Sequence, residues 1–225
     1  MARTRHVFDT DMVAHVWAQR GQDNGRNKQD NFYFVGDTIY SYGGHFPIAT
    51  FCKSPRKGAA DFVAFTYRGY SSTTSGHIHI TRRAIPARYP IVNVKDPVAV
   101  ARLCRDLANL GKPDTHKRLP DIVRSQLGDL RADYNERIAD LLDKASRART
   151  RKDEHFMEAQ ALARETQYLA RTFKRPAFAI TLPDTVADAV TQALAQADKH
   201  AKAQARAHKR AQAKQQREDK ARYES

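Results

Sequence analysis

Residues 31–51 read NFYFVGDTIYSYGGHFPIATF and are the part of the chain richest in aromatic and β-branched side chains. Bulky residues alternate on both sides of Gly36-Asp37, which is typical of a β-hairpin with a short turn. The following residues, 40–45 (YSYGGH), place two phenols, a hydroxyl and an imidazole beside two glycines. This segment is either a binding site or a demanding turn, since Gly-Gly usually marks a bulge or a turn.

The segments around the hairpin predict a β domain. A helix over residues 11–20, with Trp17 on its apolar face, would cover the sheet, and residues 21–29 are typical of an exposed basic loop. Short strands are expected over residues 46–51, 62–67, 77–80 and 91–94, and a basic hairpin loop over 54–60. We therefore predict a mostly antiparallel β domain over residues 1–95, with a short covering helix.

From Pro97 onward the composition changes to helix formers, so we expect an α+β protein with a helical region over residues 96–197. Apolar residues at helical spacing predict helices over 97–110 and 119–148. The basic stretch 147–152 (RARTRK) interrupts the pattern, which resumes at Met157 and predicts a coiled-coil-like antiparallel hairpin with a basic tip. One unbroken long helix is the alternative. A last helix is expected to begin near Val186.

Residues 198–225 hold nine Lys and Arg and four Asp and Glu, with almost no apolar side chain larger than alanine. Such a segment has helix-forming residues but no face to bury, so it is either a solvated helix or a disordered arm. We expect a nucleic-acid-binding arm in which Arg206, Lys209 and Arg210 contact phosphates. The alternative is a tail that only maintains solubility.

The whole chain of 225 residues carries a net charge of +14, which favours polyanionic partners, nucleic acid first. Both parts are basic, because residues 1–96 hold 13 basic and 7 acidic side chains and residues 97–225 hold 26 and 18. Cys52 and Cys104 lie far apart in the sequence, so neither a zinc site nor a disulfide framework is indicated. No segment has the length and apolarity of a signal peptide or a membrane span, and we expect a cytoplasmic protein without cofactor or metal.

A second polar segment, residues 67–77, is dense in hydroxyl groups and is the preferred site. Its side chains could meet those of the 40–45 segment at one rim of the sheet and hold a phosphate. The alternative is that the hydroxyls cap turns and satisfy loop backbone groups. The predicted nucleic-acid contacts on the β domain are Arg26, Lys28, Tyr42, His45, Arg56, Lys57, Arg68, Tyr70, Ser71, Thr73, Thr74 and His77.

A weaker alternative is a phosphodiester hydrolase that uses His45, His77 and Arg68. The alternation of residues 77–81 (HIHIT) would place His77, His79 and Thr81 on one face of a strand, as in two-histidine phosphoesterases. That chemistry needs a second His-x-Thr or His-x-Ser strand, which the sequence lacks. Walker, GxSxG and HExxH motifs are also missing, so we predict no catalytic residue.

Several of these motifs together resemble the N-terminal domain of an uncharacterised protein family found in bacteriophage and plasmid genomes. They are Trp17, the run 40–43 (YSYG), the run 45–49 (HFPIA), and Arg68, Tyr70, Ser71, Thr73, Thr74 and His77. The resemblance covers about residues 7–93. It implies a mobile-element origin and one compact domain but no reaction.

Two functions from different classes follow from the sequence. The first is a non-catalytic nucleic-acid-binding accessory protein of a mobile element, which uses basic loops and a basic C-terminal arm. The second is a structural or interaction protein that forms homo-oligomers or docks a protein partner through its helical hairpin. Neither requires a membrane, and the first leaves DNA and RNA equally open, because no RNP, KH, zinc-finger or helix-turn-helix signature is present.

Overall fold

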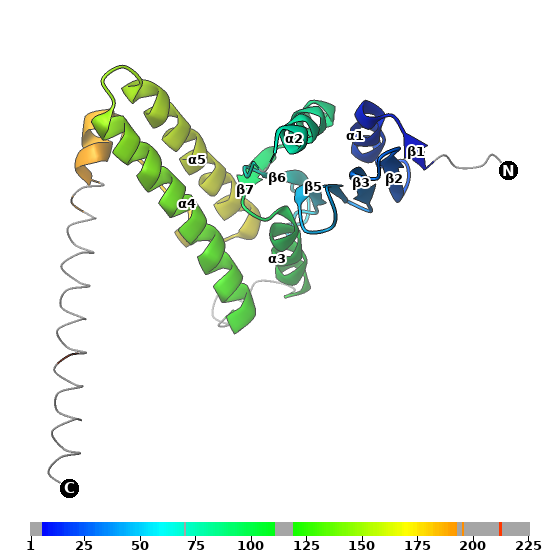
Figure 1. Ribbon diagram of the computed structural model, residues 1–225. Helices are drawn as coiled ribbons and strands as arrows, with labels where there is room; N and C mark the ends of the chain where they lie inside the picture. The colour runs from blue at the N-terminus through cyan, green and yellow to red at the C-terminus, as the bar shows by residue number, and fades with distance from the viewer. Residues whose placement is uncertain (1–5, 70, 111–118, 193–194, 196–211, 213–225) are drawn as a thin grey trace, which may run out of the picture. The chain divides into compact units, whose positions relative to one another are not determined.

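The computed structural model describes residues 6–69, 71–110 and 119–192, together with the single residues 195 and 212. A short helix over residues 186–192 follows the last labelled element. The elements shown in Figure 1 are, in chain order, β1 (Val7–Phe8), α1 (Thr10–Gln19), β2 (Asn24–Asn27), β3 (Phe32–Val35), β4 (Thr38–Ser41), β5 (Pro47–Cys52), β6 (Phe62–Thr66), α2 (Ser72–Ala84), β7 (Ile91–Val94), α3 (Pro97–Asn109), α4 (Asp121–Arg147), α5 (Lys152–Phe173) and the 3-10 turn η1 (Pro176–Phe178).

The described strands form one seven-stranded sheet in which the spatial order, β1 to β7, is the order of the chain. The pairings from β2 with β3 to β5 with β6 are antiparallel, whereas β1 pairs with β2 and β6 pairs with β7 in parallel. The predicted antiparallel pairing is therefore confirmed for β2 to β6, whereas the two outer pairs are parallel and make the sheet mixed. Parallel neighbours cannot be joined by a tight turn, and α1 and α2 supply the two crossovers that these pairs need.

The hairpin predicted around Gly36-Asp37 is confirmed as β3 and β4. Phe34 lies opposite Ile39 and both are buried, whereas the rings of Tyr33 and Tyr40 stack on the other side with their centroids 5.2 Å apart. Gly36 has a φ of 55°, in the left-handed region that a two-residue hairpin turn requires. The alternation of the sequence is thus the alternation of the two faces of the sheet.

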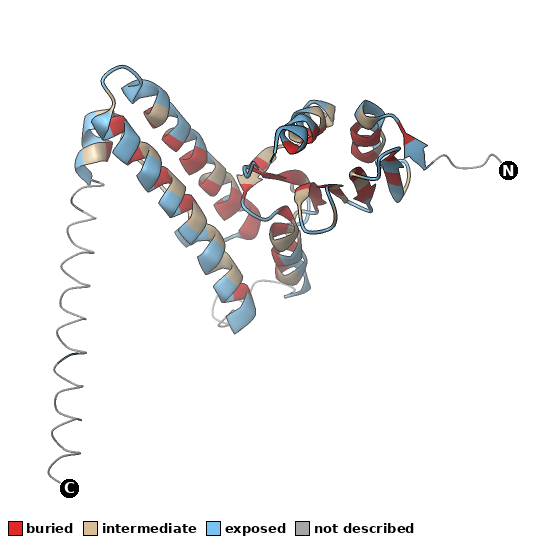
Figure 2. Ribbon diagram, viewed as in Figure 1, coloured by how far each residue is buried: buried red, intermediate tan, exposed pale blue. Residues whose placement is uncertain are grey.

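Helices cover both faces of the sheet, and Figure 2 shows the buried residues gathered on the strands and on the helix sides that face them. α1 and α2 lie side by side on one face, and α3 packs against β5 and β6 on the other (Figure 1). The prediction that Trp17 packs in the core is confirmed, because its side chain is 1% exposed and its Nε1 donates to the Asp37 carbonyl oxygen at 3.0 Å.

The loop predicted over residues 21–29 is wrong in its middle, where residues 24–27 form β2. Its sequence, NGRN, lacks apolar side chains, but Gly25 and Asn27 are buried. A Cβ at Gly25 would lie 2.7 Å from the Phe34 ring and 2.9 Å from the Phe8 ring. The two rings can therefore pack against the backbone of this strand only because Gly25 has no side chain. Asn27 Oδ1 accepts from the backbone N–H groups of Asn31 and Phe32.

The strand predicted over residues 77–80 is also wrong, because these residues lie in the middle of α2. The buried residues of this helix are Thr74, His77 and Thr81, which are three and four positions apart. His79 is exposed, so it does not share a face with His77. The alternation of His and Ile is typical of a strand, and the helical pattern went unrecognised because the buried residues of this helix are polar.

α4 and α5 are joined by residues 148–151, which confirms the predicted helical hairpin. The described residues divide into two compact units, the first made of those within 1–135 and 164–180 and the second of those within 136–163 and 181–225. The first unit therefore extends beyond the boundary predicted at residue 95. It holds the sheet, α1 to α3, the first part of α4 and the last part of α5.

Side-chain contacts explain why these parts of α4 and α5 belong to the first unit. The Tyr67 hydroxyl donates to Asp133 Oδ1 at 2.5 Å, and Asn93 Nδ2 donates to Glu165 Oε1 at 2.6 Å. The Tyr134 hydroxyl, fully buried, donates to the other oxygen of Glu165. Glu165 thus joins the edge strand β7 to both helices through one carboxylate.

Candidate functional site

The preferred polar segment contributes to a hydrogen-bonded chain, the His77 network, made of the buried Ser41, Thr74 and His77 and the exposed Ser71. Ser41 Oγ lies 2.8 Å from His77 Nδ1 and 3.5 Å from Thr74 Oγ1, which lies 3.1 Å from Ser71 Oγ. Ser71 is the N-cap of α2, and its Oγ accepts from the Thr74 backbone N–H at 3.2 Å. The imidazole also stacks on the buried Phe32 ring, with 4.3 Å between centroids.

The burial and hydrogen bonds of the His77 network indicate a structural role. Ser41 is fully buried and His77 is 4% exposed, so neither a serine nucleophile nor a histidine base at this position is open to a substrate. Burial lowers the pKa of His77, which keeps the imidazole neutral near pH 7. The network ties the end of β4 to the start of α2, which is the capping role that the sequence left open.

Tyr42 and His45 lie in the connection from β4 to β5, and Tyr42 is the one that lies beside this network. Tyr42 has a φ of 50° and is 44% exposed, and its ring centroid lies 6.2 Å from that of His77. His45 is exposed and its ring lies close to Gly43, at whose position a Cβ would be 3.2 Å from it. Arg68 and Thr73 are exposed, and Tyr70 lies outside the described residues. The structure therefore gathers most of the predicted cluster at one end of the sheet.

The other predicted contacts are distributed differently. Arg26 lies 3.6 Å from Asp30 and Lys28 lies 3.2 Å from Asp9, so both are partly neutralised by exposed ion pairs. Arg56 and Lys57 are exposed in the connection from β5 to β6, at the opposite end of the sheet from Tyr42. Arg206, Lys209 and Arg210 fall outside the part of the chain that the structure describes.

Charge is strongly asymmetric along the β domain. Residues 38–95 hold eight Lys and Arg but a single carboxylate, that of Asp61. The topology gathers most of these cations at the end of the sheet where β5 ends and where β6 and β7 begin. The last turn of α2 and the connection to β7 return the chain to that end. We call it the basic end. Its six cations are Arg20, Lys53, Arg56, Lys57, Arg83 and Arg88, and its three carboxylates are those of Asp23, Asp37 and Asp61.

The opposite end has no excess of positive charge. It holds the cations Arg26, Lys28, Arg68 and Lys95 against the carboxylates Asp9, Asp11, Asp30 and Asp96. Asp96 is occupied as the N-cap of α3, where it accepts from the backbone N–H groups of Val98 and Ala99. The two ends of one sheet thus differ in net charge, and the basic end is the one suited to a polyanion.

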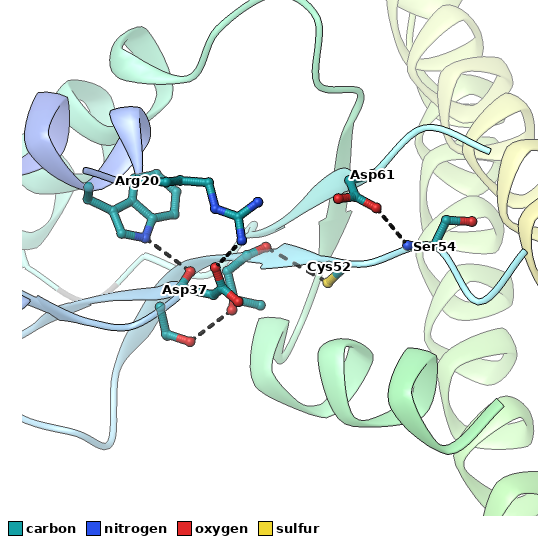
Figure 3. Close-up of polar contacts among 8 residues, drawn as sticks. Arg20, Asp37, Cys52, Ser54 and Asp61 are labelled. Carbon is teal, nitrogen blue, oxygen red and sulfur yellow. Dashed lines mark hydrogen bonds and ion pairs between the residues drawn. The ribbon is translucent and has the colours of Figure 1, made fainter. Parts of the chain in front are cut away.

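Figure 3 shows how the carboxylates of the basic end are held. Arg20 points toward Asp37, with 2.7 Å between Nη2 and Oδ1, and Cys52 lies at the end of β5. Asp61 faces Ser54 and accepts from its backbone N–H at 3.0 Å, which closes the connection between β5 and β6. Two of the three carboxylates are therefore engaged, and Lys53, Arg56 and Lys57 are exposed beside them.

Sequence reasoning missed Arg20, Lys53, Arg83 and Arg88 as members of one surface. For Lys53, Arg83 and Arg88, the signal that could have found them is the count over residues 38–95, which contains eight cations and one carboxylate. Arg20 lies outside that range. The sequence could not predict that these four cations converge at one end of the sheet, because this depends on α2 being a helix that returns the chain to the start of β7.

Within the described ranges, no cluster of three or more His, Cys, Asp or Glu side chains is placed to hold a metal ion. Nor does any helix of those ranges combine the length and apolarity needed to cross a membrane. No family model, curated protein or solved structure matches the chain. Its function is therefore inferred from geometry and charge.

Proposed function

We propose that this protein is a non-catalytic nucleic-acid-binding accessory protein of a bacteriophage or other mobile element, which contacts the phosphate backbone through its basic end. The observation that carries the proposal is that six cations and only three carboxylates lie at the basic end of the sheet. Lys and Arg on such a surface displace counterions from the nucleic acid, which gives a sequence-independent and salt-dependent affinity. Phosphate contacts of this kind do not distinguish DNA from RNA.

The test compares two triple variants with equal loss of charge. The first replaces Lys53, Arg56 and Lys57 with Gln at the basic end, and its matched control replaces Lys28, Arg68 and Lys95 with Gln at the opposite end. Binding of fluorescein-labelled duplex DNA, single-stranded DNA and single-stranded RNA is followed by anisotropy between about 50 mM and about 200 mM salt. Thermal melting of each variant shows that the fold is intact.

For duplex DNA, loss of three phosphate contacts lowers the slope of log affinity against log salt by about 2.7 in the first variant. The control is expected to keep nearly the wild-type slope. Equal losses in the two variants would show that only net charge matters and would contradict an interface at the basic end. A wild-type protein that binds no nucleic acid at low salt but forms a salt-insensitive complex with a protein would favour the interaction alternative.

A further inference from the structure

Two arginines from distant parts of the chain meet over a pair of aromatic rings at the basic end. The Phe51 and Tyr89 rings are in contact edge to face, with centroids 5.0 Å apart and planes at 72°. The guanidinium carbon of Arg20 lies 5.0 Å from the Phe51 centroid, and that of Arg88 lies 4.9 Å from the Tyr89 centroid. Arg20 is the C-cap of α1 and Arg88 belongs to the connection to β7, so only the fold brings them together.

Like charges that converge in this way repel each other, and the structure offsets only part of that repulsion. Asp37 neutralises one guanidinium through its contact with Arg20, and the ring faces attract both cations. Hydrogen bonding from Arg88, and to a smaller degree from Arg20, lowers the pKa of Tyr89, while burial acts in the opposite direction. After Asp37 is counted, the group keeps a net charge of one positive unit.

We propose that Arg20, Arg88 and the Tyr89 hydroxyl form a site for one phosphodiester group of a bound nucleic-acid strand. This inference rests on the proposed function and gives it a defined position. A guanidinium presents two parallel N–H donors that match two phosphate oxygens, and the rings hold these arginines in place, so less side-chain freedom is lost on binding. A net charge of one unit matches an internal phosphodiester, which carries one negative charge, better than a terminal phosphate, which carries nearly two.

The decisive comparison is between Arg88→Gln and Arg83→Gln. Arg83 is exposed at the same end and has the same charge, but it lies outside the aromatic pair. With a fluorescein-labelled duplex, Arg88→Gln is expected to weaken binding about tenfold and to lower the salt slope by about 0.9. Arg83→Gln removes another cation of the basic end and is expected to lose less, about threefold, and to lower the slope by less than Arg88→Gln does. Arg88→Lys, which keeps the charge without the fork, is expected to fall between Arg88→Gln and the wild type.

The outcomes separate this site from the proposed function. If the wild type binds in a salt-dependent way but Arg88→Gln and Arg83→Gln lose equal affinity, the site is overturned and the basic end stands. If the wild type binds neither DNA nor RNA, both are overturned. Oligonucleotides with and without a 5′-phosphate are compared in parallel, and equal affinity is expected. A preference for the 5′-phosphate that Arg88→Gln abolishes would overturn the assignment to an internal phosphodiester.

Discussion

At the scale of single residues, the least expected feature is a histidine that serves as a core residue. His77 stacks on Phe32 and bonds to Ser41 inside the domain, and burial holds its pKa below the ordinary value of 6.5. The imidazole of the unfolded chain takes up its proton near that ordinary value, whereas the folded protein resists protonation until the pH is lower. Between these two values the unfolded state binds more protons, so stability falls as the pH falls below about 6.5.

Replacement of His77 with Gln should therefore flatten the pH dependence of stability. The measurement is urea unfolding between about pH 5 and about pH 8, where one titrating group contributes at most about 1.4 kcal/mol per pH unit. The variant is expected to be less stable than the wild type at neutral pH but to lose less stability on acidification. His79→Gln, which changes an exposed histidine of the same helix, is the control. If both variants keep the wild-type pH dependence, His77 is not the titrating group.

Gly25 offers a second prediction at this scale. A methyl group at this position would press into the Phe8 and Phe34 rings, and both rings are buried and unable to move away freely. Gly25→Ala is therefore expected to destabilise the fold by about 1–3 kcal/mol. Gly21→Ala is the matched control, because nothing lies within 4 Å of a Cβ there. Denaturant unfolding of both variants tests this, and an unchanged midpoint for Gly25→Ala would show that the edge of the sheet adjusts.

These same residues show what a single sequence could not reveal. The alternating hairpin was predictable because its buried side chains are large and apolar. β2 was not predictable, because Gly25 matters by having no side chain where two rings pack, and Asn27 matters by its hydrogen bonds with the backbone of Asn31 and Phe32. Neither contribution leaves a trace in a hydrophobic pattern.

At the scale of secondary-structure elements, α2 is the case where the period was misread. Five alternating residues, His77 to Thr81, satisfied a strand pattern over too short a window, whereas the helix buries Thr74, His77 and Thr81. A serine at the N-cap position, Ser71, was an available helix signal. This error also hid the candidate interface, because a strand in this position would not have carried Arg83 and Arg88 to the start of β7.

Packing of α3 against the end of β5 gives a prediction about the two thiols. Cys52 and Cys104 are both almost fully buried, and the pKa of Cys52 is raised, first by hydrogen bonding to the Cys104 thiol and then by burial. Burial shields both thiols from the reagent, and the raised pKa disfavours the reactive thiolate of Cys52, so neither cysteine should react with Ellman's reagent at neutral pH in the folded protein. Both should react once denaturant unfolds the chain. Rapid reaction of the native protein would mean that α3 separates readily from the sheet.

At the scale of the whole molecule, more than half of the net charge of +14 is carried by two regions, the basic end and the segment 198–225. The latter has no apolar face in its sequence, so its deletion removes little area that folding could bury. A chain that ends at residue 197 is expected to keep the wild-type melting temperature and to bind nucleic acid with a smaller salt slope. Full-length protein with Arg206, Lys209 and Arg210 replaced by Gln is the control for loss of charge without loss of chain. A melting temperature many degrees lower would show that this segment packs in the fold.

The coincidence of strand order with chain order has a kinetic consequence. Strands β2 to β6 can pair successively through connections of two to nine residues, whereas β1 and β7 join only after α1 and α2 have formed across residues 9–23 and 67–90. Local pairings cost less loop-closure entropy, so the antiparallel centre should be ordered in the folding transition state and the parallel margins should follow. Ile39→Val in β4 is then expected to slow folding, with a φ value above about 0.5, and Val92→Ala in β7 is expected to speed unfolding, with a φ value below about 0.3. A reversed order would mean that the crossovers, rather than the hairpins, start the assembly of this sheet.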